Sequence, residues 1–252
     1  MLKVESLRYS IDAKEILTGI SAHFEPFRIH GIVGPNGSGK STLLKNVCRI
    51  WEPNGGRVLI DGRDARDFSR RELSRTVTLV PQNTAVGFPV SVYDIVTMGR
   101  NPHLGRFQPL RKKDRDIIDR ALKETHAEGL KDRIVNELSG GECQLVIIAR
   151  ALATEASLIL LDEPTSDLDI KHSLTIMDLL VDLKGKGKTI IVTVHDLNLA
   201  RRYCDTLAIL YQGALYFSGS PEQALSRENI KKVFDVDVTE IRSDEKSFLY
   251  FH

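Results

Sequence analysis

The chain has 252 residues, of which 42% are hydrophobic and 27% charged, and its formal net charge is +1. This composition is that of an ordinary globular protein, long enough for one large domain or two small ones. The nearly balanced charge gives no general case for nucleic-acid binding, which usually shows as a basic face or a high pI. We therefore expect no nucleic-acid partner, although such a total is compatible with a local basic patch.

Neither a disulfide framework nor a zinc knuckle is indicated, because Cys48, Cys143 and Cys204 lie far apart and form no C-x-x-C pair. The first five residues include an acid and are strand-like, so we expect no signal peptide. No apolar run approaches the roughly 18 residues that a membrane helix needs. Any work at a membrane would go through a partner.

The sequence predicts mainly strands in the first third of the chain. Hydrophobic spacing predicts strands over 2–7, 16–24 and 28–33, a helix over 41–51, and a strand over 57–60. From about residue 83 to 154 charged helical stretches take over, notably 111–125, which has one apolar face.

Two continuous apolar runs, 158–161 and 189–194, fit a buried and largely parallel sheet, with a helix over 170–183 between them. This order predicts an α/β core into which the helical stretch is inserted. Two strand-like pieces between residues 236 and 251 predict a terminal hairpin.

A glycine-rich segment between a predicted strand and a predicted helix fits the P-loop pattern. It reads Gly34, Pro35, Asn36, Gly37, Ser38, Gly39, Lys40, Ser41, Thr42. Its backbone N–H groups would converge on phosphate oxygens at the positive end of the following helix. Lys40 would reach the β- and γ-phosphates, and the Ser41 hydroxyl would coordinate Mg²⁺. The alternative interpretation is purely structural: a glycine turn with an exposed lysine.

Two adjacent acids, Asp162 and Glu163, follow the apolar run 158–161. A strand end rarely places two carboxylates beside a core, which favours a functional interpretation. Asp162 suits a role near Mg²⁺ through the water shell of the ion. Glu163 suits polarising or deprotonating an attacking water molecule.

Residues 138–142, Leu-Ser-Gly-Gly-Glu, resemble the signature motif of ABC ATPases, and a predicted helix over 144–152 follows them. The resemblance covers nearly the whole chain. It implies that Tyr9 stacks on adenine, that Gln82 contacts Mg²⁺ and the water, and that His195 contacts the γ-phosphate. Residues 166–169 match the D-loop. Alone, each of these residues has a plainer structural interpretation.

The resemblance implies ATP and Mg²⁺ as ligands and assigns a site residue by residue. The catalytic residues are Lys40, Gln82, Glu163 and His195. The residues at Mg²⁺ are Ser41, Gln82 and Asp162. The residues at the nucleotide are Tyr9, Gly34, Pro35, Asn36, Gly37, Ser38, Gly39, Lys40, Ser41, Thr42, Ser139, Gly140, Gly141, Glu142 and Asp169.

The implied fold is α/β, with a P-loop NTPase (RecA-like) core, a largely parallel sheet, an N-terminal antiparallel β-subdomain and an inserted α-helical subdomain. One ABC ATPase domain would fill residues 1–252. Its core would be 1–82 and 157–235, its helical subdomain about 83–156, and its C-terminal hairpin about 236–252. Because the chain carries one P-loop and one signature, a complete site would need an ATP-dependent, head-to-tail homodimer.

The stretch Gly99-Arg100-Asn101-Pro102-His103, together with residues 195–200, resembles the importers of iron chelates, haem and cobalamin. This implies a peripheral protein at the cytoplasmic face of the cell membrane. Gly87 to Phe107 would contact membrane permease subunits, and an external substrate-binding protein would act through that permease. The alternatives are a soluble ABC ATPase of the iron–sulfur assembly type, or the ATPase of another ABC importer or exporter.

Three features depart from the family pattern. The signature ends in Glu142 where Gln is commoner, residues 143–145 lack the usual basic side chains, and the D-loop has Asp167 where Ala or Asn-His is commoner. These departures affect contacts expected between subunits. None of them alters a predicted catalytic residue.

Overall fold

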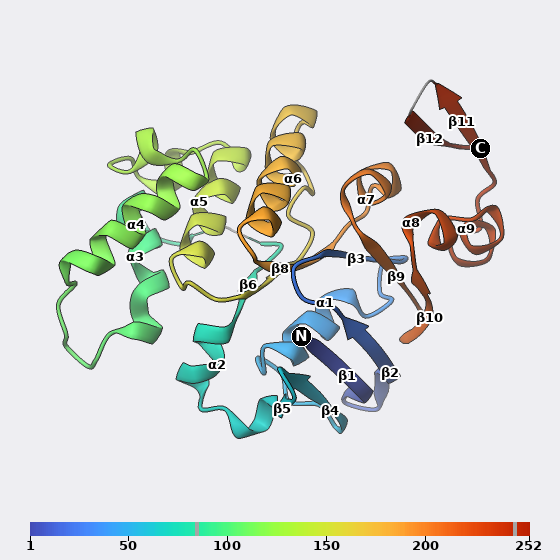
Figure 1. Cartoon of the computed structure of the whole chain (residues 1–252), viewed down its shortest axis with the longest axis horizontal. Helices are drawn as coiled ribbons and strands as arrows, with labels where there is room; N and C mark the ends of the chain where they lie inside the picture. The colour runs from blue at the N-terminus through green and yellow to red at the C-terminus, as the bar shows by residue number, and fades with distance from the viewer. Residues whose placement is uncertain (84–85, 244–245) are drawn as a thin grey trace. The chain divides into compact units, whose positions relative to one another are not determined.

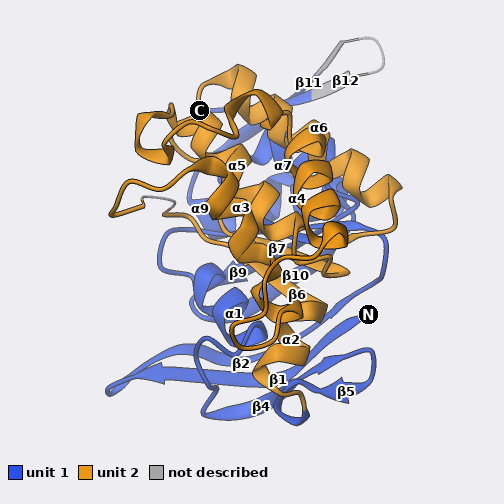
Figure 2. Ribbon diagram, turned by 90° about the vertical axis from the view of Figure 1, so that its left-hand side faces the viewer, with its two compact units in different colours: residues 1–67, 190–252 blue, residues 68–189 orange. Residues whose placement is uncertain are grey.

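The computed structural model describes residues 1–83, 86–243 and 246–252, and its elements are labelled in Figure 1. The chain divides into two compact units: unit 1 comprises 1–67 and 190–252, and unit 2 comprises 68–189 (Figure 2). The predicted helical subdomain and hairpin include residues 84–85 and 244–245, which lie outside the described residues. The predicted division of the domain remains a prediction.

Unit 1 consists mainly of strands. Its elements in the described residues are β1 Leu2–Ile11, β2 Lys14–Phe24, β3 Ile29–Val33, α1 Lys40–Val47, β4 Gly55–Ile60, β5 Arg63–Asp64, η1 Ala65–Asp67, β8 Thr189–Thr193 (from its second residue), α7 Leu197–Tyr203, β9 Thr206–Tyr211, β10 Ala214–Gly219, α8 Pro221–Ala224, α9 Arg227–Phe234, β11 Val238–Ser243 and β12 Lys246–Phe251.

The strands of unit 1 pair in three groups. An antiparallel group has the order β2-β1-β4-β5. In the second group β3 is flanked by β8 and β9, parallel to both, and β10 adds antiparallel to β9. The third is the antiparallel pair β11-β12 at the end of the chain. Every residue of β3 and β8 is buried, as the continuous apolar runs predict for strands covered on both faces.

Unit 2 is largely helical. Its elements in the described residues are α2 Arg70–Thr76, β6 Val77–Val80, α3 Val92–Thr97, η2 Met98–His103, α4 Lys112–Glu124, η3 Glu128–Leu130, η4 Val135–Glu137, α5 Gly140–Leu152, β7 Leu158–Leu161 and α6 Ile170–Gly185. Strands β6 and β7 pair in parallel. The predicted apolar face of α4 is buried, including Ile117, Ile118 and Leu122.

The predicted α/β class is confirmed, with its mostly parallel central strands and its N-terminal antiparallel strands. Near the end of the chain, β11 and β12 pair antiparallel in their described residues. Within the described part of the chain, no helix combines the length and the apolar character needed to cross a membrane.

Candidate functional site

The glycine loop of unit 1 runs from the buried strand β3 into α1 (Figure 1). Gly34 has a φ of 153°, and a Cβ there would lie 2.1 Å from the Leu210 carbonyl oxygen. Gly39 has a φ of 103°, and a Cβ there would lie 2.7 Å from the Leu17 side chain. Both positions require glycine, since another residue would be strained and would clash. The loop ends at the N-terminus of α1, whose partial positive charge favours phosphate.

Lys40 and Ser38 give this loop its chemical character. The Lys40 residue is only 5% exposed, and its Nζ donates to the carbonyl oxygens of Gly34 at 2.9 Å and Pro35 at 3.3 Å. Ser38 Oγ is buried and has no hydrogen-bond partner among the described residues. A buried ammonium group and an unsatisfied hydroxyl at a helix N-terminus fit the oxygens of a polyphosphate, which would partner both.

The other predicted residues of the loop differ in exposure. Asn36 and Gly37 are exposed, whereas Pro35, Ser41 and Thr42 are half-buried. The tip of the loop is thus open to a ligand.

Tyr9 and His195 complete the predicted residues of unit 1. The Tyr9 ring is half-buried and stacks on Trp51, with ring centroids 5.4 Å apart and planes 2° apart. His195 is exposed and directly precedes Asp196, whose carboxylate accepts the N–H groups of Asn198 and Leu199 and so caps α7. Their roles toward adenine and the γ-phosphate remain predictions.

Unit 2 places the two predicted carboxylates at the end of β7. Asp162 is 3% exposed and Glu163 is 9% exposed. The Gln82 amide donates to Glu163 Oε2 at 2.6 Å, which brings two predicted catalytic residues together although 81 residues separate them in sequence. Glu163 has a left-handed φ of 51°, and its carbonyl oxygen accepts the Ser166 hydroxyl at 2.9 Å. Such a backbone is costly for a non-glycine residue and is common at functional sites.

The residues predicted for Mg²⁺ fit that ion chemically. Ser41, Gln82 and Asp162 all offer oxygen atoms, which are the ligands that Mg²⁺ prefers. The buried Asp162 carboxylate supplies negative charge. Mg²⁺ is usually held by one or two carboxylates together with phosphate oxygens, so this set suits an ion that arrives with a nucleotide.

The signature motif forms the start of α5. The Ser139 hydroxyl accepts the N–H of Glu142 at 3.3 Å, and the Glu142 carboxylate accepts the N–H and the hydroxyl of Ser139 at 2.8 Å and 2.9 Å. This reciprocal cap explains why Glu is compatible at position 142. The Ser139 N–H and hydroxyl lower the pKa of the Glu142 carboxyl below its ordinary value.

Residues of the signature and D-loop meet at His172, a residue that the sequence analysis did not identify. A Cβ on Gly141 would lie 2.3 Å from the His172 ring, so this glycine permits the close approach. The His172 ring contacts the Asp169 carboxylate through Nδ1 at 2.9 Å, and Asp169 caps α6 by accepting the His172 N–H. The only sequence signal was the position three residues after an acidic cap.

The D-loop departure also has a structural explanation. Asp167 has a left-handed φ of 59°. Aspartate is among the few non-glycine residues that adopt this conformation readily, because its short side chain can hydrogen-bond locally. The unusual residue therefore suits the local backbone.

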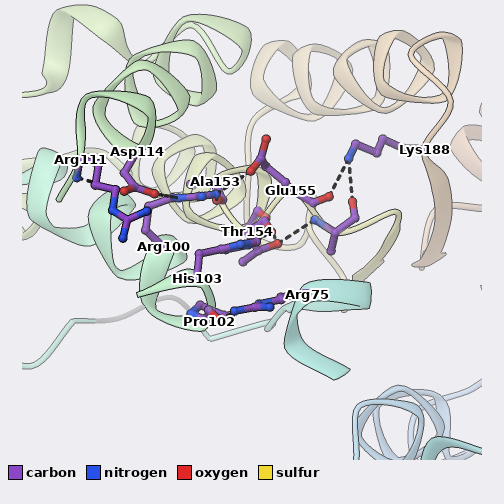
Figure 3. Close-up of polar contacts among 12 residues, drawn as sticks. Arg75, Arg100, Pro102, His103, Arg111, Asp114, Ala153, Thr154, Glu155 and Lys188 are labelled. Carbon is purple, nitrogen blue, oxygen red and sulfur yellow. Dashed lines mark hydrogen bonds and ion pairs between the residues drawn. The ribbon is translucent and has the colours of Figure 1, made fainter. Parts of the chain in front are cut away.

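The stretch from Gly99 to His103 belongs to η2 of unit 2, and Figure 3 shows the polar contacts of Arg100, Pro102 and His103. A Cβ on Gly99 would lie 2.2 Å from the Arg150 carbonyl oxygen, so the close packing of η2 on α5 requires glycine. His103 is half-buried, and its Nε2 lies 2.8 Å from the Thr154 carbonyl oxygen. Gly99 and His103, which carry the resemblance to the importers, therefore also have a structural role in packing η2 within unit 2.

Arg100 is the centre of these contacts (Figure 3). Its side chain is 3% exposed and bonds to Asp114 at 3.0 Å, Glu155 at 2.9 Å and the Ala153 carbonyl oxygen at 2.7 Å. Burial acts to raise the pKa of the Asp114 carboxyl, but the Arg111 N–H and the Arg100 guanidinium outweigh it and lower that pKa. The network joins η2 and α4 to the loop that leads into β7.

Replacing Arg100 by Met is expected to destabilise the protein by about 3–5 kcal/mol, because Asp114 would stay buried and lose its cation. The midpoint of urea unfolding measures this loss. Arg66→Met, which removes an exposed ion pair with Asp64, is the control and is expected to cost less than about 1 kcal/mol. Equal midpoints for the two variants would contradict the structural role of Arg100.

The contribution of Asp114 has a defined pH dependence. Because its folded-state pKa is lowered, the stabilisation is present above the ordinary aspartate pKa of about 3.9 and is lost as the pH falls through the folded value.

Residues 17–166, more than half of the chain, match the ABC transporter family. The cobalamin import ATP-binding protein BtuD of Halobacterium salinarum is 38% identical over 238 residues, which is 94% of this chain and 59% of that protein. This chain thus spans less than two thirds of that relative.

Two further matches cover both partners almost completely. The hemin import ATP-binding protein HmuV of Pseudomonas entomophila is 38% identical over 243 residues, or 94% of each chain. Among solved structures, an ABC transporter described as being of the metal-chelate type, in an inward-facing conformation, matches with a TM-score of 0.86 and 30% identity. That match covers 100% of this chain and 96% of the other.

Proposed function

This chain belongs to the ABC transporter ATPase family, and we propose that it energises an importer of an iron chelate, haem or cobalamin. The observation that carries the ATPase chemistry is the buried Asp162–Glu163 pair, with the Gln82 amide bonded to Glu163. The import role is supported by relatives that are import ATP-binding proteins for cobalamin and hemin. The metal-chelate type of the matching structure supports the same class of cargo.

Each site residue has a role in ATP hydrolysis under this proposal. Lys40 and the N–H groups of the loop bind the β- and γ-phosphates, and Tyr9 stacks on adenine. Ser41, Gln82 and Asp162 hold Mg²⁺, which when bound neutralises charge on the phosphate oxygens. Glu163 accepts a proton from the attacking water, and His195 stabilises the γ-phosphate.

Two copies of the chain are needed in this proposal. The chain carries one P-loop and one signature, so Ser139, Gly140 and Gly141 of the partner subunit would close each nucleotide site. A two-fold axis would then create two identical sites from one isologous interface. Asp169 caps the start of α6, which follows the D-loop, and Glu142 caps the start of α5, which begins with the signature. Both caps would hold these segments in place at the proposed interface.

The segment from Gly87 to Phe107 is the proposed contact with the permease, which would place the protein peripherally at the cytoplasmic face of the membrane. With Gly99 and Arg100 buried, the large apolar side chains left exposed are Phe88 at 59%, Met98 at 40% and Phe107 at 93%. Exposed aromatic side chains commonly anchor protein interfaces. An external substrate-binding protein would act through the same permease.

Replacing Phe107 by Ala is expected to weaken association with the permease about 30-fold, because the exposed ring would be an anchor of the interface. The measurement is recovery of the permease on the tagged chain from detergent-solubilised membranes. ATP hydrolysis by the isolated chain is expected to stay unchanged. Tyr250→Ala, which removes another exposed aromatic ring, 59% exposed and located in unit 1, is the control. Equal recovery with both variants would reject the proposed contact.

The same purification tests the transport assignment. We expect the wild-type chain to carry a membrane permease, which in turn retains a binding protein loaded with an iron chelate, haem or cobalamin. A chain that hydrolyses ATP but associates with no membrane protein would instead support the soluble, iron–sulfur assembly type of ABC ATPase.

A further inference from the structure

Trp51, the one tryptophan in the sequence, lies face to face with Tyr9. Their planes differ by 2°, their centroids lie 5.4 Å apart, and both residues are half-buried. The Lys45 Nζ lies 4.4 Å from the centroid of the Trp51 ring. An offset parallel pair of this kind is a favoured aromatic arrangement, and a cation near the ring adds a further attraction.

Hydrogen bonds from the backbone on both sides of Tyr9 to Asn54 hold the two rings in this arrangement. The Asn54 N–H donates to the Arg8 carbonyl oxygen at 2.9 Å, and the Ser10 N–H donates to Asn54 Oδ1 at 2.6 Å. The segment after α1 is thereby fixed to the residues directly before and after Tyr9. Trp51, three residues before Asn54, is held over the ring by these bonds and by the end of α1.

The stack is also connected to the phosphate loop within unit 1. Tyr9 pairs across the β1–β2 ladder with Leu17, and a Cβ on Gly39 of the loop would meet the Leu17 side chain at 2.7 Å. On the other side, the N–H groups of Ile50 and Trp51 donate to the Lys45 carbonyl oxygen in α1, the helix that begins at the loop. The contacts through Leu17 and those through Lys45 therefore both fix the ring pair relative to the phosphate-binding residues.

We propose that Trp51 is a positioning residue for the nucleotide base: it fixes the Tyr9 ring from one face, so that adenine stacks on the other. This inference rests on the proposed ATPase function. The ligand chemistry is a flat purine ring joined to a polyphosphate. Stacking on a ring whose orientation is already fixed requires less ordering upon binding, which strengthens recognition of the base. The phosphate contacts at Lys40 are independent of this effect.

The test separates the base from the phosphates. Wild type, Trp51→Leu, Trp51→Phe and the control Tyr250→Leu are titrated with a ribose-labelled fluorescent ATP analogue, and the label is displaced by ATP or by inorganic tripolyphosphate, each with Mg²⁺. Trp51→Leu is expected to weaken ATP binding about fivefold and to leave tripolyphosphate binding unchanged. Trp51→Phe is expected to restore most of the loss, and Tyr250→Leu is expected to match wild type.

Two results would overturn the role of Trp51: Trp51→Leu binding ATP as wild type does, or losing ATP and tripolyphosphate equally. Where Trp51→Leu does not fold, wild type decides. Its single tryptophan is expected to change emission on binding ATP but not tripolyphosphate, and an identical response to both ligands overturns the proposal. Failure of wild type to bind ATP at all would instead overturn the proposed function.

Discussion

Replacing Glu163 by Gln is expected to leave ATP binding intact, to lower turnover by about 10²–10⁴-fold, and to accumulate an ATP-dependent dimer. Glutamine has the shape of glutamate and retains an oxygen that can accept the Gln82 amide, so the local structure is preserved. It is not basic enough to take a proton from water. ATP would bind and join two chains, and the pair would then persist because hydrolysis no longer separates them.

Phosphate release and size-exclusion chromatography in ATP-Mg²⁺ measure the two parts of this result. Glu228→Gln, on the exposed surface of α9, is the matched control and is expected to behave as wild type. A Glu163→Gln protein that stays monomeric in saturating ATP-Mg²⁺, or that keeps most of its turnover, would contradict the assignment of Glu163.

Replacing Lys40 by Ala is expected to weaken nucleotide binding at least about 30-fold. The ammonium group is buried at the start of α1 and, in the described structure, donates to two carbonyl oxygens of its own loop. With a nucleotide present it would face phosphate oxygens, and removing one partner of a buried ionic contact costs about 2–5 kcal/mol.

Titration calorimetry with ATP-Mg²⁺ measures this loss, and circular dichroism establishes that the variant is folded. Lys123 is an exposed residue of α4, and Lys123→Ala changes the net charge by the same amount as Lys40→Ala. This control variant is expected to bind ATP normally. Undiminished binding by a folded Lys40→Ala protein would reject the glycine loop as the phosphate site.

Much of the fold could be predicted because hydrophobic spacing is a local property of the sequence. The continuous run 158–161 is β7, and the runs at 28–33 and 189–194 contain β3 and β8. The helix predicted over 41–51 ends earlier, at Val47. Arg49 adopts a left-handed φ of 52°, which turns the chain so that Trp51 reaches Tyr9. A contact between distant segments thus overrides local helical spacing.

In the candidate site, too, residues in local motifs could be predicted, whereas contacts between segments distant in the sequence could not. Motif order suggested Gln82 and Glu163, and the structure joins them directly. The contact of His172 with Gly141 depends on two different helices and has no local signature. The buried position of Arg100 was equally hidden, because arginine is usually exposed unless paired, and its partners Asp114 and Glu155 are remote in sequence.

The most direct test of the transport role is uptake by proteoliposomes that contain the permease and hold this chain and ATP-Mg²⁺ inside. With the loaded binding protein outside, wild type is expected to import the iron chelate, haem or cobalamin only when ATP is present, and Glu163→Gln is expected to import none beyond a single turnover. Uptake that continues without ATP, or that is equally fast with Glu163→Gln, would contradict the account.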